Sequence, residues 1–312
     1  MTEGQAGFLS KIQQMEKKAT GKVAEAVDLL AALRPADHQS AKIIQLPLWP
    51  DALRGVPNSV LRSALFGAIK RGRRSYHQRE QLASVDGVKI MFTGPRLDQA
   101  DLDVWEQALH LARGHDGLGT RIQFSASGFL KAIRRSTGGK DVEWLKGAFA
   151  RLASSVVEIK DGKRAYFGPM IHHGARDDDT GHYCIEINPT IVQLYGADGW
   201  SQVEFEQRMT LKGKPLAQWL HGFYTTHARP FPYKVETLHN VSGSQAKLMK
   251  HFRAELREAL DKLSDATGWG WEIDSDDLVH IERQPTKSQQ RHLDKQKPKR
   301  LKPRAGPKKA GV

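Results

Sequence analysis

The residues best suited to metal chemistry gather in one short stretch, IHHGARDDDTGHY. His172, His173 and His182 could offer imidazole nitrogens to an ion, and residues 177–179 could offer carboxylate oxygens. The stretch also has the composition of a solvated loop, because its acidic residues are followed by glycine, and it falls where a β-hairpin is expected to turn. We therefore predict no metal site and no cofactor for this chain.

Few other groups suit catalysis. No GxxxxGK[ST] motif is present, so the sequence does not support ATP hydrolysis by a P-loop. A rolling-circle nicking enzyme would need two histidines separated by one apolar residue and a nucleophilic tyrosine, whereas His172 and His173 are adjacent. The single cysteine, Cys184, suits a buried strand thiol in a reducing cytosol. We predict that the protein is not an enzyme, with a nicking enzyme as the alternative.

The charge of the chain indicates a polyanionic partner. Its 312 residues include 48 Lys and Arg against 35 Asp and Glu, a net charge of +13. Such an excess favours nucleic acid first and a membrane surface second. No apolar run approaches the ~18 residues of a membrane span, and no signal peptide is recognisable. We expect a cytoplasmic protein without a membrane partner.

Much of this charge lies in residues 284–312. This segment holds seven Lys and three Arg against one acidic residue, together with four prolines. Because almost nothing in it is apolar, we predict a disordered basic arm that contacts phosphates. A tail that only keeps the protein soluble is the alternative.

Residues 124–171 have the order of a winged helix-turn-helix: a helix, a Thr-Gly-Gly turn, a second helix and two strands joined by KDGKR. At about 100° per residue, the second helix has one apolar face. That face contains Val142, Leu145, Phe149 and Leu152. The residues predicted to contact DNA from the opposite face and from the hairpin are Lys140, Trp144, Arg151, Lys160, Lys163 and Arg164. An ordinary surface helix is the alternative.

The same order repeats nearer the C-terminus. GKPLAQWLHGFYTTH and PYKVETLHNVSG predict helices, SQAKLMKHFRAELREALDKLSDATG predicts a long helix, and WGWEI and LVHIER predict a hairpin. The apolar face of the long helix contains Leu248, Met249, Phe252, Leu256, Ala259, Leu260 and Leu263. Its first half is basic, which suits entry into a major groove. The residues expected to contact DNA are Lys247, Lys250, Arg253 and Arg257.

The predicted fold class is α+β, with tandem winged helices between a flexible N-terminal region and a disordered basic tail. The predicted parts are an amphipathic N-terminal helix (1–42), a linker with a basic helix (43–75), two winged-helix domains (76–196 and 197–283) and the tail (284–312). The apolar face of the N-terminal helix could pack on a partner or on a second copy, so a homodimer is one expected assembly.

Five stretches in this order resemble the TrfA-type initiators of plasmid replication: PNSVLRSALF, VKIMFTG, LDQADLDVWEQAL, HARPFPYKVETL and DDLVHIER. The resemblance spans residues 43–283. It implies two winged-helix domains that bind direct repeats (iterons) in double-stranded DNA at a plasmid origin, melt the adjacent DNA and recruit the host replicative helicase. It implies no enzymatic activity. A winged-helix transcriptional repressor remains an alternative with the same fold.

The same resemblance suggests a role for QLPLW. Bacterial proteins that bind the replicative sliding clamp commonly use a Gln-Leu-x-Leu-Phe-like peptide, and TrfA-type initiators have a similar one before their first domain. Gln45, Leu46, Leu48 and Trp49 match it, with Trp in place of Phe. The flanking prolines favour an extended peptide, which lowers the ordering cost of binding. The alternative is that Leu46, Leu48 and Trp49 pack on the first domain.

Overall fold

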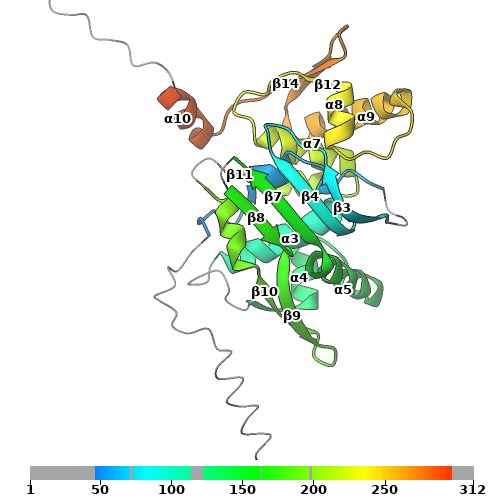
Figure 1. Cartoon of the computed structure of the whole chain (residues 1–312), viewed down its shortest axis with the longest axis vertical. Helices are drawn as coiled ribbons and strands as arrows, with labels where there is room; N and C mark the ends of the chain where they lie inside the picture. The colour runs from blue at the N-terminus through cyan, green and yellow to red at the C-terminus, as the bar shows by residue number, and fades with distance from the viewer. Residues whose placement is uncertain are drawn as a thin grey trace, which may run out of the picture. The chain divides into compact units, whose positions relative to one another are not determined.

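The computed structural model describes residues 46–70, 72, 74–113, 122–162, 164–196 and 199–296. All of them belong to one unit, Ile44–Val312 (Figure 1). The predicted N-terminal helix, Gln45, Lys163 and residues 297–312 lie outside the described residues. Within the described ranges, no helix is both long enough and apolar enough to span a bilayer.

The chain has a mixed α/β fold. The helices are α2 (Asn58–Leu61), α3 (Gln99–Ala112), α4 (Ala126–Ala132), α5 (Gly139–Ser154), the 3-10 helix η1 (Pro189–Leu194), α6 (Phe205–Thr210), α7 (Pro215–Thr225), α8 (Val235–Val241), α9 (Met249–Thr267) and α10 (Lys287–Gln296). The strands are β1 (Leu53–Pro57), β2 (Phe66–Gly67), β3 (Tyr76–Leu82), β4 (Lys89–Pro95), β5 (Leu97–Asp98), β6 (Ile122–Ser125), β7 (Val156–Asp161), β8 (Arg164–Gly168), β9 (Ile171–Asp177), β10 (His182–Ile187), β11 (Trp200–Glu204), β12 (Tyr233–Lys234), β13 (Gly270–Ile273) and β14 (Leu278–Glu282).

Helix α3 is the centre of the first hydrophobic core. It begins with a capping box, in which the Asp98 side chain accepts the Asp101 backbone N–H and the Asp101 side chain accepts that of Asp98. Leu102, Trp105 and Leu109 are buried along the helix. Helix α3 contacts β1, α5, α7 and β10, so it joins several layers of the fold.

Two antiparallel sheets accompany α3 in the first core (Figure 1). One has the strand order β3-β4-β7-β8, and the other has the order β6-β10-β9. The hairpin β7–β8 pairs Asp161 with Arg164, so the strands predicted on either side of KDGKR are confirmed. Helices α4 and α5 precede this hairpin, as the sequence predicted.

A second hydrophobic core is formed by α7, α8, α9 and the sheet β12-β14-β13. Helix α9 buries Phe252, Leu256, Ala259, Leu260 and Leu263, which confirms most of its predicted apolar face. Met249 is only partly buried against this core, and Leu248, which precedes the helix, is 50% exposed. The helix ends at Gly268, whose φ of 72° is readily adopted by glycine.

The segment 43–75 differs from the predicted linker. Strand β1 pairs with β11, and the helix expected in this segment ends at Leu61. The apolar residues expected on one longer helix pack instead into the first core, where Leu61, Leu65 and Phe66 are buried. Strand β11, which lies in the predicted second domain, also belongs to the first core, since Val203 is buried there.

The start of the C-terminal segment also differs from the sequence prediction. Residues 284–312 were predicted to be disordered, but α10 extends from Lys287 to Gln296. The Gln289 side-chain amide donates a hydrogen bond to the Thr225 carbonyl, 2.8 Å away, at the end of α7. Arg283 donates to the Tyr224 carbonyl at 2.7 Å. These contacts hold the beginning of this segment against the second core.

Candidate nucleic-acid interface

The first turn of α5 presents one of the predicted basic residues to solvent. Gly138 precedes the helix without a side-chain cap, and Lys140 is exposed as the second helical residue. The unpaired backbone N–H groups of a helix N-terminus carry partial positive charge, and a nearby lysine adds to it. This turn therefore suits an anionic ligand such as a phosphate.

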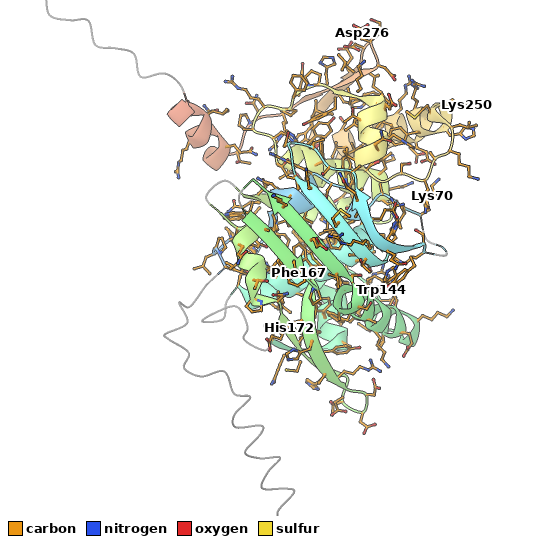
Figure 2. The ribbon with its side chains drawn as sticks, in the orientation of Figure 1. Lys70, Trp144, Phe167, His172, Lys250 and Asp276 are labelled. Carbon is orange, nitrogen blue, oxygen red and sulfur yellow. The ribbon has the colours of Figure 1, made fainter. Side chains whose placement is uncertain are left out.

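Trp144 is less available than predicted. It is half-buried on α5 (Figure 2). The Arg135 guanidinium lies over its ring, 3.4 Å from the centroid. Arg135 also donates to Asp141 at 3.0 Å. The indole therefore forms part of a packed arrangement between the α4–α5 turn and the first turns of α5.

Arg151 was predicted to contact DNA from an open face of α5, and this prediction is wrong, because its guanidinium pairs with a buried carboxylate. Its guanidinium lies 2.7 Å from a carboxylate oxygen of Asp101, whose side chain is fully buried. Arg74 forms a second ion pair with the same carboxylate at 2.9 Å. The helical angle placed Arg151 opposite the apolar face, but α3 covers that side of the helix end and supplies a buried anion.

The β7–β8 hairpin brings two lysines together. Lys160 is exposed on β7, and its cross-strand partner on β4 is Lys89, which is also exposed. Like charges directly opposite each other repel, so an anion above this position would stabilise the pair. The Arg164 side chain is outside the described atoms. Lys89 was not predicted as a site residue, because only the strand register places it beside Lys160.

Helix α9 keeps two of its predicted basic residues exposed, Lys250 and Arg257. Lys250 projects from the first turn, away from the body of the protein (Figure 2). Lys247 is exposed as well, but it precedes the helix rather than lying on it. These three residues form a basic surface along the first half of α9.

Arg253, between them in sequence, has an internal partner. Its Nε donates to Asp277 at 3.0 Å, and its second guanidinium nitrogen donates to the other carboxylate oxygen at 2.7 Å. This bidentate pair fixes the turn of the β13–β14 hairpin to α9. The hydrogen bond from Arg253 lowers the pKa of Asp277 below its ordinary value. Arg253 therefore positions the hairpin beside α9.

The segment predicted to bind the clamp packs on the first core. Leu46 and Trp49 are 3% and 4% exposed, whereas Leu48 is 71% exposed. The Trp49 ring stacks on Tyr195, with centroids 6.2 Å apart. The prediction that Leu46 and Trp49 are displayed by a linker is therefore wrong, and the intramolecular alternative describes both.

Two neighbours explain how the core accommodates Trp49. Its indole N–H donates to His110 Nδ1 at 3.2 Å, and burial lowers the pKa of His110 to about 4, so this nitrogen can accept at neutral pH. A Cβ on Gly55 would lie 2.5 Å from the indole ring, so glycine leaves the space that the ring fills. Gly55 is the one residue in the sequence that relates to this packing, but no local pattern connects it to Trp49, so the packing could not be predicted from the sequence.

The likeness to known proteins first defines a structural class. The chain shares its mixed α/β fold with domains 2 and 3 of RctB, at a TM-score of 0.51 and 12% identity over 73% of this chain and 99% of that one. The Pi initiator protein in complex with iteron DNA aligns with a TM-score of 0.48 and 11% identity, over 75% of this chain and 96% of that one.

The sequence then defines the family. The model of the TrfA protein family matches residues 14–283, so the chain belongs to the TrfA family. A relative from Escherichia coli, the plasmid replication initiator protein TrfA, is 29% identical over 269 residues, which cover 81% of this chain and 69% of the relative.

Proposed function

We propose that this protein is a plasmid replication initiator that binds iterons in double-stranded origin DNA and promotes opening of the origin in the cytoplasm. Membership of the TrfA family supports this function. The observation that carries the DNA-binding part is the exposed basic surface of α9, Lys247, Lys250 and Arg257, beside a hairpin that Arg253 fixes in place. Recruitment of the host replicative helicase, and a homodimeric form, are further parts of the proposal.

Two winged-helix units are the architecture that we propose for DNA binding. In the first, α4 and α5 are followed by β7–β8; in the second, α8 and α9 are followed by β13–β14. Each second helix has a buried apolar face and an exposed lysine in its first turn, Lys140 or Lys250. A recognition helix needs this combination, because one side must pack while the other enters a groove. Lys89 and Lys160 would then contact phosphates.

The test is binding of the full chain to DNA that flanks its own gene. Nuclease footprinting should show several evenly spaced protected repeats, and the affinity should fall steeply as salt rises. One isolated protected operator would favour a transcriptional repressor. A covalent tyrosyl-DNA product on supercoiled DNA with a divalent metal would instead establish a nicking enzyme.

We also propose that Gln45, Leu46, Leu48 and Trp49 bind the sliding clamp only after Leu46 and Trp49 leave the first core. Leu48 is exposed, but Trp49 must give up its ring packing and its hydrogen bond to His110. Trp49→Ala should therefore cost about 3–5 kcal/mol of stability, as other large-to-Ala core changes do.

Thermal unfolding and clamp binding should be measured on the same Trp49→Ala protein, with Leu48→Ala as the control. Leu48→Ala should weaken clamp binding while leaving the melting temperature nearly unchanged, because its side chain is 71% exposed. If the parent protein shows no clamp affinity, the clamp proposal fails and Trp49 is solely a core residue.

A further inference from the structure

The β9–β10 hairpin places two adjacent histidines on the same face of a sheet. Successive residues of a regular strand point to opposite faces. Here the register shifts between two strand pairs, Glu186 with His173 and Ile187 with Ile171, so His172 is an extra residue in β9. Such a β-bulge sets two residues against one and re-aims their side chains. It brings both rings to Glu186.

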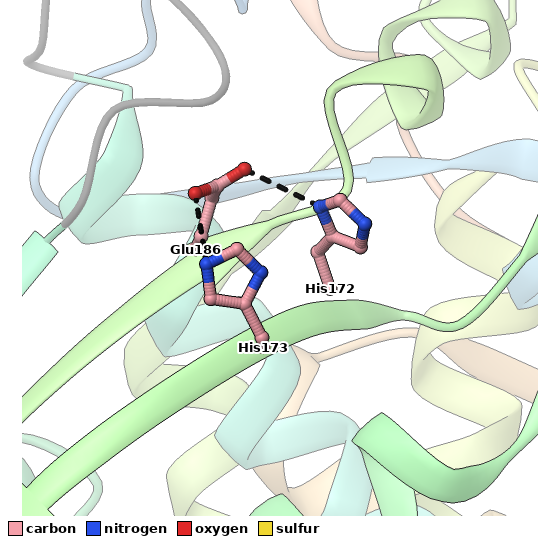
Figure 3. A group of neighbouring side chains, drawn as sticks. All are labelled: His172, His173 and Glu186. Atoms are coloured by element: carbon pink, nitrogen blue, oxygen red, sulfur yellow. Dashed lines mark hydrogen bonds and ion pairs between the residues drawn. The ribbon is translucent and has the colours of Figure 1, made fainter. Parts of the chain in front are cut away.

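The three side chains converge on a small volume (Figure 3). His172 Nδ1 lies 3.3 Å from one carboxylate oxygen of Glu186, and His173 Nε2 lies 3.2 Å from the other. The ring centroids of the two histidines are 5.0 Å apart. One ligand atom from each residue falls within 4.8 Å of the others, although the chain was predicted to contain no metal site.

These distances fit the chemistry of a divalent transition metal. Two ligands bound to zinc at about 2.0–2.1 Å with tetrahedral angles lie about 3.3–3.4 Å apart, close to the two nitrogen–oxygen separations above. Because each separation involves a different oxygen of Glu186, the carboxylate would bind the ion through both oxygens. Two imidazoles and one carboxylate suit zinc, cobalt or nickel, whereas calcium and magnesium prefer oxygen ligands. Both histidines are exposed, so further coordination positions would be open to water or to an anion.

The surroundings leave Glu186 directed to the histidines. Two cations at the hairpin turn have another partner, since Lys146 and Arg176 each lie 3.0 Å from Asp178. Gly174, next to His173, has no Cβ; one built there would lie 3.0 Å from Ile185, a close contact at the bulge. The backbone of this hairpin thus holds the two rings beside one carboxylate.

We infer that His172, His173 and Glu186 form a binding site for one divalent transition-metal ion, with zinc as the probe. The sequence indicated the histidines but not the third ligand, since Glu186 lies on the partner strand. Residues 177–179 and His182, which share the histidine-containing stretch, do not belong to this group of ligand atoms. The site does not depend on the proposed DNA-binding function.

The test uses the full-length chain without a histidine tag. Zinc is titrated in competition with a chromophoric chelator, and cobalt binding is followed by its visible absorption. The parent protein should bind one equivalent, and zinc should raise its melting temperature by mass action. His172→Ala, His173→Ala and Glu186→Gln should each weaken the site by more than about tenfold, because even the loss of a group that only orients a ligand costs about 10–100-fold.

His182→Ala and Cys184→Ser are the matched controls, since both residues lie in the same hairpin and outside the proposed ligand set. Both should bind zinc as the parent does. The metal-free variants should melt like the metal-free parent, because the histidines are exposed. The inference is overturned if the parent binds no zinc at micromolar concentration. It is also overturned if one equivalent binds equally well to His172→Ala and Glu186→Gln.

Discussion

Helices α5 and α9 follow the same local pattern but use their basic residues differently. Arg151 of α5 is drawn into an ion pair with buried Asp101, whereas Lys250 and Arg257 of α9 remain exposed. Arg253 is the intermediate case, because its pair with Asp277 is partly exposed at 38% and 36%. Helical angle alone cannot show whether a basic face binds DNA or the protein's own anions. The comparison makes α9 the stronger candidate for contacts with DNA.

Among the changes that test this comparison of α5 and α9, the largest expected effect is on the stability of the first core. Arg151→Ala removes one of the two guanidinium groups that neutralise buried Asp101, so it should cost about 3 kcal/mol of unfolding free energy. Urea unfolding followed by tryptophan fluorescence measures the loss. A change below about 0.5 kcal/mol, the range of ordinary surface substitutions, would restore Arg151 as a surface residue comparable to Lys250.

The next effect is on DNA affinity through α9. Lys250→Ala combined with Arg257→Ala should weaken origin binding by about 10–100-fold. It should also reduce the slope of log affinity against log salt concentration (the salt slope) by about 2, because each cation lost removes about one phosphate contact. Lys262→Ala is the control, since Lys262 lies nearer the far end of the same helix and pairs with Asp265. Equal affinity of the double variant and this control would remove α9 from the interface.

An effect of pH on stability is expected between α6 and α3. Arg208 of α6 is buried against α3, 2.8 Å from Asp103 and 3.1 Å from Glu106, and the second carboxylate oxygen of Glu106 has no hydrogen-bond partner. Burial raises the pKa of Glu106 from 4.5 to about 7. Between these values the folded protein retains a proton that the unfolded chain has released, so the contribution of Glu106 to stability falls as pH rises and levels off above pH 7.

Glu106→Gln should remove this fall, which is on the order of 2 kcal/mol. Thermal unfolding of both proteins at pH 5 and pH 8 measures it, and the change in stability from pH 5 to pH 8 should be less favourable for the parent than for the variant. Identical pH dependence in both proteins would show that Glu106 is ionised throughout and that its charge is fully compensated by Arg208.

The smallest effect is expected at the first turn of α5. Lys140→Ala should weaken DNA binding only about twofold to threefold and lower the salt slope by about 1, because one exposed lysine contributes a single phosphate contact. Its unfolding free energy should match that of the parent. A loss of affinity larger than that of the α9 double variant would show that α5, and not α9, contributes more to DNA binding.

Much of the local structure could be predicted because it depends on neighbours in sequence. The buried faces of α5 and α9 follow from apolar spacing, and the β7–β8 turn follows from KDGKR. The partners of Arg151 and Trp49 could not be predicted in this way, since Asp101 and His110 lie 50 and 61 residues away. Glu186 was missed for a related reason: only the bulged register sets both histidines against it.

The lysine pair across β4 and β7 has a consequence for the protein without a ligand. Lys89 and Lys160 repel each other, so counterions condensed near this position should protect the strands, and raising salt should slow amide hydrogen exchange there. At a salt-bridged position such as Arg79 and Glu158, salt has the opposite effect. A bound polyanion would act like a very high local concentration of counterions, and the sheet would become most rigid when DNA is held.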